Sequence, residues 1–578
     1  MLNQKSNEKI VRLLLFIFIL GLVCSLALLL PQVRNFIIDI GEKALGRSLS
    51  REYWMRVLWR YSAVIAALCA APSISILLPS SNLERTQKFF SLLCIAVIGV
   101  SIAAIISMQI RVRSLWLDEA FLAASIVTRD WSNLLVPPLD NMQSAPALYV
   151  IAVKLLGGLL GYSEFSLRLF SFFAFIGLLL CTKEFSKKVL NYSNYQTAFV
   201  VAMSASLPTF IWYANELKPY ISDALFVVLT LLCYFYYTQG KIKLPALTVL
   251  CVIFFGFSTP VIFFIGGIFI YEFIASAIAK NTKKALLVFL AGFTILVLSS
   301  LYFRWWHLPV LGGMQIFWDD HAERTSLIVR LRGLFRGSGN SNSSFLGFLV
   351  PFALLGAFPL IKAKNRIAWS TLISFILVFS ASLLGFWPLR GRLWLFLPAI
   401  VLIFTPAGID FVRNKIKYEK ITNLIVFISL TALILFSSIH SLGYFGDGMY
   451  FHNQEVNPLI YHVKNNINEG EKLYVCSFAR FTFEFKNGYG TKRIGNVYMD
   501  NIIFGRSREQ WNQNILGDEL RSIIEHERVY LLFQHHSHRG RRRIYPGLDV
   551  LQNYGTLIEV MNFHRTPLYF FERHPDSF

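Results

Sequence analysis

Two adjacent carboxylates, Asp118 and Glu119, follow a long apolar stretch of the chain. They belong to SLWLDEAF (114–121), and the stretch FFSLLCIAVIGVSIAAIISMQI (89–110) that precedes them carries no charge. A carboxylate held at the end of a membrane span can act as general base toward an incoming hydroxyl or amine. It can also cap a helix or pair with a nearby arginine, so these two residues alone leave both interpretations open.

Cations follow at two other apparent span ends. Lys218 and Tyr220 lie in YANELKPY, where one apolar run ends and the next begins, and Arg390 and Arg392 open the run in GFWPLRGRLWLFLP. A lysine or an arginine in such a place can hold a phosphate, the guanidinium group in a bidentate manner. Anchoring at the level of the lipid headgroups is the simpler alternative.

A third segment, SAPALYVIAVKLLGGLLGYSEFSLRLFSFF (144–173), contains charges within a mostly apolar run. Burying Arg168 or Lys154 at the centre of a span would cost on the order of 2.5–3.5 kcal/mol, and both side chains are long enough to reach an interface instead. Glu164 lies four residues before Arg168, and this spacing favours an ion pair along one helix.

The polar segment 304–343 supplies FWDDHAERT (317–325), in which His321 lies among three carboxylates. These side chains could ligate a metal ion or pair with arginines, but their spacing matches no diagnostic metal motif. The chain contains no CxxC or HExxH pattern either. The basic run HHSHRGRRR (535–543) is expected to be a solvated loop, with anion binding as the alternative.

These residues must be positioned by membrane helices. The chain has 578 residues, 55% of them hydrophobic, and a mean hydropathy of +0.52. A bilayer core of roughly 30 Å needs about 20 apolar residues of helix, so the sequence predicts a polytopic helical membrane protein. Apolar runs of that kind lie at 11–30, 59–79, 89–110, 196–213, 219–238, 284–303, 344–361, 367–387, 391–409 and 420–440, with shorter or interrupted ones at 146–182 and 244–278.

The distribution of positive charge predicts the topology. Basic loops such as KEFSKK (183–188) and RNKIKYEK (413–420) lie between spans, and the positive-inside rule assigns them to the cytoplasm. This assignment needs 146–182 to cross once and gives about 13 crossings. The LDEAF, LKPY and LRGR segments then share the extracytoplasmic face. Such loops account for the net charge of +21, which therefore gives no case for nucleic-acid binding.

After residue 440 the composition indicates a small soluble α/β domain. The predicted elements are strands at KLYVCSF (472–478) and RVYLLFQ (528–534), an amphipathic helix at 509–527 and a short helix at 547–555, before TLIEVMNF (556–563). The predicted domains are two extra N-terminal spans in 1–88, a main membrane domain in 89–440 and the α/β domain in 441–578.

Taken in chain order, these segments resemble the protein-mannosyltransferase and aminoarabinose-transferase group of the GT-C glycosyltransferases. LDEAF resembles the acidic motif of that family's first extracytoplasmic loop, and segment 144–173 its proline–tyrosine segment with the following acid–aromatic–arginine turn. YANELKPY resembles the Arg-Pro-Tyr element, with Lys218 in place of arginine. WPLRGRLWLFLP resembles the glycine–arginine segment that opens a late span, so the resemblance extends from residue 89 to about residue 410.

The resemblance implies a GT-C-type fold and transfer of a sugar from a polyprenyl-phosphate donor to a lipid, glycan or protein acceptor on the extracytoplasmic side. Asp118 would be the general base, with inversion at the anomeric carbon, and Glu119 would shape the site. The residues implied to bind the donor phosphate or the substrate are Lys218, Tyr220, Arg390, Arg392, Tyr149 and His321. The resemblance also implies that no metal or other cofactor is needed, and a place in the bacterial cytoplasmic (inner) membrane.

Two other kinds of function stay open from the sequence. A lipid-linked glycan transporter or flippase would carry ionisable residues deep inside several spans, often with inverted repeats. A glycan polymerase or ligase would use similar arginines on long outer loops, without an evident need for the early LDEAF segment. The charges of this chain concentrate at span ends, which favours a glycosyltransferase.

Overall fold

The described part of the chain begins at residue 83. The computed structural model describes residues 83–110, 113–310, 346–384, 386–387, 391–414, 430–435, 437–438, 455–488, 493–494, 497–498, 501–505, 513–534, 548–562 and 566–575. The parts of the sequence predictions that lie outside these residues are the spans 11–30 and 59–79, most of 420–440, Arg390, the segment with His321 and the basic run 535–543.

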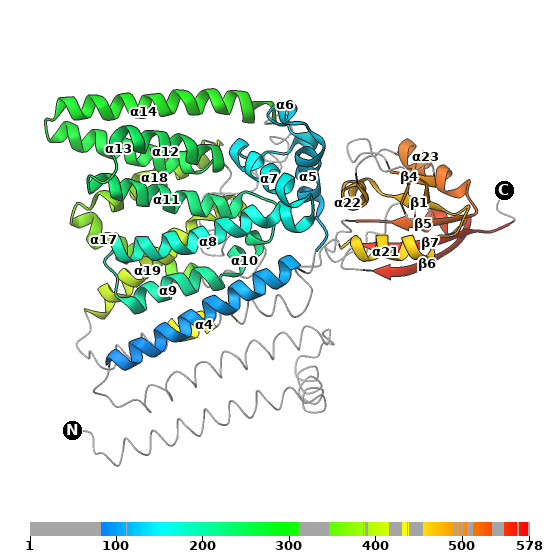
Figure 1. The fold of residues 1–578 in the computed structure, drawn as a ribbon, viewed down its shortest axis with the longest axis horizontal. Helices are drawn as coiled ribbons and strands as arrows, with labels where there is room; N and C mark the ends of the chain where they lie inside the picture. Colours follow the sequence, from blue (N-terminus) through cyan, green and yellow to red (C-terminus); the bar gives the residue numbers. More distant parts are fainter. Residues whose placement is uncertain are drawn as a thin grey trace, which may run out of the picture.

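Most of the described chain forms a bundle of apolar helices, as the hydropathy predicts (Figure 1). Within the described residues, seven helices are long and apolar enough to cross a membrane. They are α4 (Leu83–Ile110), α8 (Glu164–Lys188), α11 (Tyr220–Thr238), α13 (Val261–Ile278), α14 (Thr282–Tyr302), α18 (Arg366–Leu383) and α19 (Phe396–Arg413). The chain is therefore a multi-pass membrane protein.

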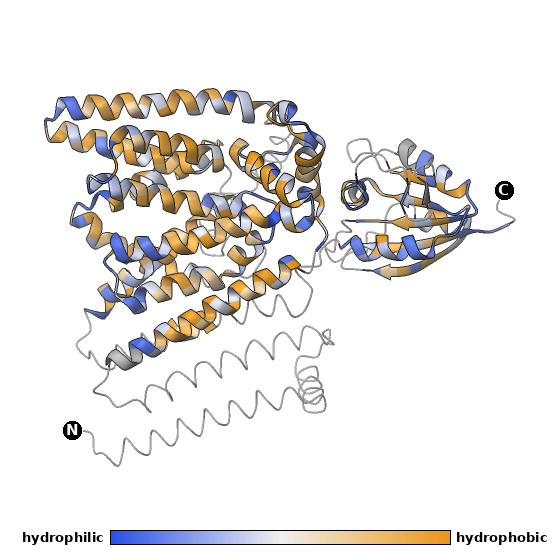
Figure 2. Ribbon diagram, viewed as in Figure 1, coloured by the Kyte–Doolittle hydropathy of each residue, from blue (hydrophilic) through white to orange (hydrophobic). Residues whose placement is uncertain are grey.

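The outer surface of the bundle is apolar, as a lipid-facing surface must be. On α14, Leu286, Leu290 and Phe293 are each about half exposed or more, and most of the helical ribbon of the bundle has the hydrophobic colour in Figure 2. The structure thus confirms the membrane class from the surface as well as from helix length.

Several predicted spans are interrupted or short. The predicted run 196–213 is a pair of helices, α9 (Asn194–Ser206) and α10 (Pro208–Ala214), bent by 58°. The bend follows from Pro208, which cannot donate the hydrogen bond that would continue α9. The shorter apolar helices are α7 (Ala147–Leu160), α12 (Leu244–Phe257) and α17 (Leu346–Lys362).

The predicted segment 146–182 folds as two helices, α7 and α8, separated at Gly161. Gly161 has φ +79°, a backbone conformation that favours glycine. Only α8 of this pair is long enough to cross a bilayer by itself. The glycine cluster therefore marks a turn between the two helices.

Small residues bring two pairs of membrane helices close together. Gly267 of α13 lies against α18, where an added Cβ would stand 2.5 Å from the carbonyl oxygen of Ser370. Gly408 of α19 lies in the same way against the backbone of Phe352 on α17. These contacts fix α18 and α19, the two helices that flank Arg392 in the sequence.

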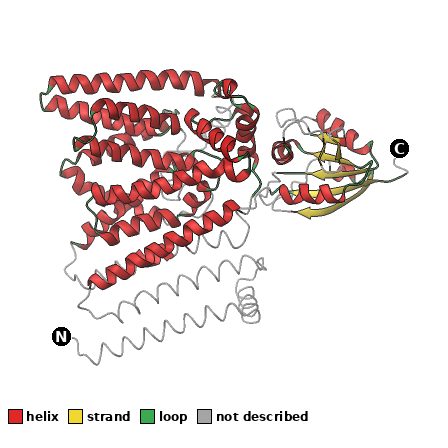
Figure 3. Ribbon diagram, in the orientation of Figure 1, coloured by secondary structure: helices red, strands yellow, loops and turns green. Residues whose placement is uncertain are grey.

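The C-terminal part is an α/β domain, as predicted, and Figure 3 shows its strands beside the helical bundle. Its five-stranded sheet has the order β4-β1-β5-β7-β6, in which β4, β1 and β5 are parallel and β7 and β6 antiparallel additions. The strands are β1 (Lys472–Val475), β4 (Ile502–Phe504), β5 (Arg528–Leu532), β6 (Gly555–Asn562) and β7 (Pro567–Arg573), with a separate pair β2 (Arg493–Ile494) and β3 (Val497–Tyr498). The helices are α21 (Asn457–Asn466), α22 (Ser477–Asn487), α23 (Gln513–Ile524) and α24 (Leu548–Leu551).

The predicted strand KLYVCSF is only partly correct. Strand β1 ends at Val475, and helix α22 begins at Ser477. Helix α22 places Phe481 and Phe485 against the membrane part. This helix turns out to matter for the candidate site.

Three short elements lie at the end of the bundle that faces the α/β domain (Figure 1). They are α5 (Leu117–Thr128), α6 (Trp131–Leu134) and the 3-10 turn η1 (Asp140–Met142). Together with α7 they carry the first acidic motif and the polar residues around it.

Candidate functional site

Asp118 and Glu119 lie in the first turn of α5, where the positive end of the helix dipole favours negative charge. The backbone N–H of Trp116 donates to Glu119 Oε2 at 3.2 Å. At the other end of α5, Lys154 Nζ donates to the carbonyl oxygens of Ile126 and Arg129 at 2.7 and 2.6 Å. Lys154 therefore caps α5 from a buried position.

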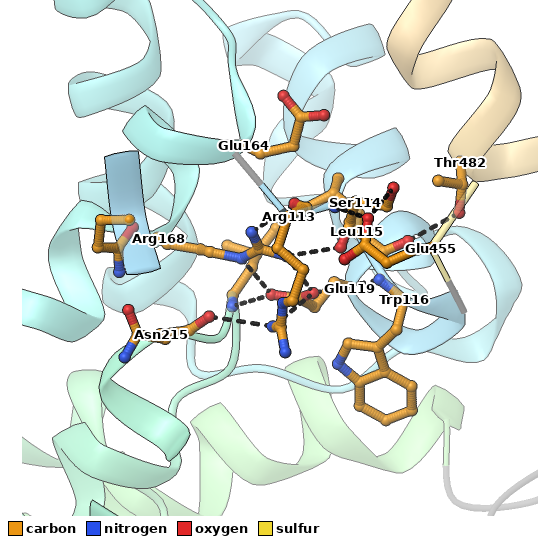
Figure 4. Close-up of polar contacts among 12 residues, drawn as sticks. Arg113, Ser114, Leu115, Trp116, Glu119, Glu164, Arg168, Asn215, Glu455 and Thr482 are labelled. Atoms are coloured by element: carbon orange, nitrogen blue, oxygen red, sulfur yellow. Dashed lines mark hydrogen bonds and ion pairs between the residues drawn. The ribbon is translucent and has the colours of Figure 1, made fainter. Parts of the chain in front are cut away.

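Glu119 is the centre of a buried ion cluster (Figure 4). Its carboxylate accepts from Arg168 Nε at 2.8 Å and Nη2 at 2.6 Å, and from the Leu217 N–H at 2.7 Å. Arg113 Nη2 lies 3.5 Å from Oε2. Burial acts to raise the pKa of Glu119, but the charge and hydrogen bonds of Arg168, with Arg113, hold it below its usual value. Glu119 is thus a fixed carboxylate that anchors α5.

The predicted Glu164–Arg168 pair along α8 is wrong. Arg168 turns to Glu119, 49 residues away in the sequence. Glu164 accepts instead from Lys486 Nζ at 3.2 Å and Asn457 Nδ2 at 3.0 Å, both in the C-terminal domain. A partner across domains outcompetes the one on the same helix.

Asp118 points away from that cluster and reaches Arg392, on the 3-10 turn η3 (Gly391–Trp394). The guanidinium Nη2 donates to Asp118 Oδ2 at 2.9 Å, and the Asp118 side chain keeps 25% of its surface exposed. The Arg392 guanidinium lies 5.2 Å from the ring centre of Tyr220 and 5.6 Å from that of Trp116. The two aromatic faces hold it beside Asp118 by cation–π attraction.

Lys218 stands in the turn between α10 and α11. Its Nζ donates to Gln143 Oε1 at 2.7 Å, and the side chain is almost fully buried. Burial lowers the pKa of Lys218 to about 8, and the positive charge of Arg392 adds to this, whereas Asp118 opposes it. The structure thus brings Asp118, Lys218, Tyr220 and Arg392 to one end of the bundle.

Glu216 is a site residue that the sequence reasoning missed. It is 1% exposed, and within the described residues its Oε2 has no hydrogen-bond partner. Burial raises the pKa of Glu216 to about 7, and the negative charge of Glu119 contributes. The sequence signal that could have identified Glu216 is its place between two apolar helices, two positions before Lys218. An acid buried in such surroundings is costly and therefore indicates a function.

Tyr149 lies beneath the site. It is fully buried, and its hydroxyl lies 3.2 Å from Ser171 Oγ, which in turn donates to the carbonyl oxygen of Lys218 at 3.3 Å. In this structure Tyr149 supports the Lys218 turn, and its substrate-binding role stays a prediction. The roles of Arg390 and His321 also stay predictions, because both residues lie outside the described part.

Two hydrogen bonds at the start of α7 hold the segment next to Gln143, the partner of Lys218. The indole Nε1 of Trp306 donates to the Ala145 carbonyl at 2.7 Å, and the Ala147 N–H donates to the Tyr302 hydroxyl at 2.8 Å. The segment is therefore held from α14 and its continuation. Among the described residues, no group of three or more His, Cys, Asp or Glu side chains could hold a metal ion.

The fold and these residues define a multi-pass helical membrane protein with a charged site at one end of its bundle and a small α/β domain beside it. Among solved structures, the chain is similar to ArnT from Cupriavidus metallidurans in the apo state, with 11% sequence identity and a TM-score of 0.47. It is also similar to ArnT from Cupriavidus metallidurans bound to undecaprenyl phosphate, with 10% identity and a TM-score of 0.46. Each comparison covers 83% of this chain and 97% of the other. No protein-family model and no curated protein sequence matches the chain.

Proposed function

We propose that this protein is a membrane glycosyltransferase that moves a sugar from a polyprenyl-phosphate donor to a nucleophilic acceptor. The observation that carries the proposal is the partly exposed carboxylate of Asp118, held 2.9 Å from Arg392 and close to the turn that bears Lys218. One base and two cations thus come from three separate elements. Three of the four motifs that resemble GT-C enzymes supply these residues.

The two cations suit a phosphate that leaves with negative charge. Lys218 and the Arg392 guanidinium would bind the donor phosphate, and their charges stabilise the negative charge that develops as the phosphate departs, most strongly at the buried Lys218. Arg392 offers a planar fork that matches phosphate oxygens. The lipid tail of the donor would lie along the apolar bundle.

Asp118 would then act on the acceptor. Its carboxylate takes the proton of a hydroxyl or amine, whose lone pair attacks the anomeric carbon opposite the phosphate. The bond from carbon to the phosphate oxygen breaks, and its electron pair stays on the phosphate. One displacement of this kind inverts the anomeric centre. Glu119 would hold α5, and hence Asp118, in register.

In the resting arrangement Arg392 is shared between Asp118 and two aromatic rings. A bound phosphate would compete for the same guanidinium and leave Asp118 a stronger base. Donor binding would therefore prepare Asp118 for the acceptor.

The positive-inside rule and the sequence resemblance support an extracytoplasmic site in a bacterial inner membrane. The basic loops follow the ends of α8 and α11 and precede the start of α18. The candidate residues lie at the opposite ends, at the start of α11 and of α19. Transfer of the sugar to the acceptor without a required metal ion is part of the same proposal.

The donor-binding part is tested by steady-state transfer with purified full-length protein and a labelled polyprenyl-phosphate sugar. Arg392→Lys should raise the donor KM about tenfold, because lysine cannot bind the phosphate in a bidentate manner. The matched control is Arg413→Lys at the far end of α19, where Arg413 pairs with Asp410. Equal donor KM values for both variants would contradict the assignment of Arg392.

A further inference from the structure

The segment that leads into α5 is enclosed from two sides (Figure 4). From the membrane part, Arg168 Nη1 donates to the Arg113 carbonyl at 2.7 Å and Nη2 to the Ser114 carbonyl at 2.9 Å. The same guanidinium binds Glu119. One side of the segment is therefore fixed by a single arginine on α8.

The other side is fixed by the C-terminal domain. The backbone N–H and the hydroxyl of Ser114 donate to Glu455 Oε2 at 3.2 and 2.9 Å. The Ser114 Oγ in turn accepts the N–H groups of Val456 and Asn457 at 3.1 and 2.9 Å. The Ser114 side chain thus binds backbone N–H groups at the start of α21, and the Glu455 side chain binds a backbone N–H group just before α5.

Helix α22 contacts the next residues. The Thr482 hydroxyl donates to the Leu115 carbonyl at 2.9 Å, and the ring of Phe481 lies edge-on to that of Phe121, with centroids 4.8 Å apart. Leu115 and Thr482 are both buried. This contact reaches α5 itself, one turn beyond Asp118.

These groups are buried and polar, so their hydrogen bonds depend on docking. Ser114, Glu455 and Thr482 are each less than a tenth exposed. A buried hydrogen-bonding group that loses its partner is costly, so the two parts meet in one defined geometry. A flexible tether between two independent domains would not need such groups.

We propose that Glu455 and Thr482 are positioning residues, and that the C-terminal domain acts as a clamp on the segment 113–116 to set the place of Asp118. The inference rests on the proposed function, in which Asp118 is the base. Lys218 and Arg392 stand on other elements, the turn before α11 and η3. Loosening the clamp should slow the chemical step more than it weakens donor binding, in which Trp116 of the clamped segment takes part only through its contact with Arg392.

The test compares Glu455→Ala and Thr482→Val with the wild type as full-length protein in lipid nanodiscs. We expect kcat to fall about ten- to a hundredfold, since small displacements of a catalytic group cost that much. The donor KM should change less than kcat, and amide hydrogen exchange in residues 113–120 should become faster. Glu455→Gln, which retains an acceptor oxygen, should recover part of kcat.

The matched control is Glu572→Gln, which removes an exposed ion pair with Arg528 in the same domain. It should leave kcat and exchange in 113–120 as in the wild type. If Glu455→Ala keeps wild-type kcat and exchange, or if Glu572→Gln reproduces its loss, the clamp is overturned. If Glu455→Ala does not fold, Ser114→Ala serves the same comparison.

The two proposals fail separately. A wild-type protein that transfers no sugar from any polyprenyl-phosphate donor overturns the proposed function. Hydrogen exchange needs no substrate, so unchanged exchange in residues 113–120 of Glu455→Ala overturns the clamp by itself.

Discussion

Asp118 and Glu119 are neighbours in the sequence but have separate environments. Glu119 is fully buried and satisfied by Arg168 and the Leu217 N–H, so its protonation would break the anchor of α5. Asp118 stays partly exposed and shares one arginine. A pair of adjacent acids on a helix points in directions about 100° apart, which allows one to hold the scaffold and the other to meet a substrate.

Lys218 gives a prediction for the dependence on pH. Its pKa is lowered from its usual 10.5 to about 8, so the ammonium group is charged below pH 8 and loses its charge as the pH rises through that value. The kcat/KM for the donor should therefore fall up to about tenfold between about pH 7 and 9. Lys218→Arg, which stays charged, should remove this decline. A wild-type profile that is flat across this range would contradict it.

At the scale of elements, three features position the site. Helix α5 is fixed at its start by Arg168 and at its end by Lys154. The Lys218 turn rests on Ser171. The third feature is η3, which begins after α18 and leads directly into α19. The close packing of α18 and α19 in the bundle therefore determines the position of Arg392.

The contact of α13 with α18 supplies the element-scale prediction. Gly267→Val should destabilise the protein by about 1–3 kcal/mol, because the new side chain meets backbone that cannot yield easily. The expected observation is a lower Tm in detergent. Gly99→Val on α4 is the control, since nothing lies within 4 Å of the position of its Cβ. Similar Tm losses in the two variants would show that this packing is not limiting.

Across the whole molecule, local sequence patterns predicted the helices and strands better than they predicted which charged side chains pair with each other. Helix length and hydropathy were enough to place α4, α11, α14 and α18. Basic loops were enough to predict that Asp118 and Arg392 share a face, although 274 residues separate them. Both inferences depend on the bilayer, which imposes length and charge rules on any chain.

The partners that the sequence did not reveal depend on turns and on docking. The sequence predicts that Arg168 pairs with Glu164 on the same helix. The turn at Gly161 and the fold of α7 instead bring Glu119 within reach of Arg168. Glu164 is then taken by Lys486, 322 residues away. No local pattern contains that information, because it is set by how the C-terminal domain meets the bundle.

The most direct test of the central claim is sugar transfer by Asp118→Asn in proteoliposomes supplied with a labelled polyprenyl-phosphate sugar and its acceptor. Asparagine keeps the size of the side chain and cannot take a proton, so kcat should fall by at least about a hundredfold without a rise in the donor KM. Asp410→Asn, which alters an acid paired with Arg413 at the far end of α19, is the control. Transfer by Asp118→Asn at the wild-type rate, with equal protein levels, would contradict the account.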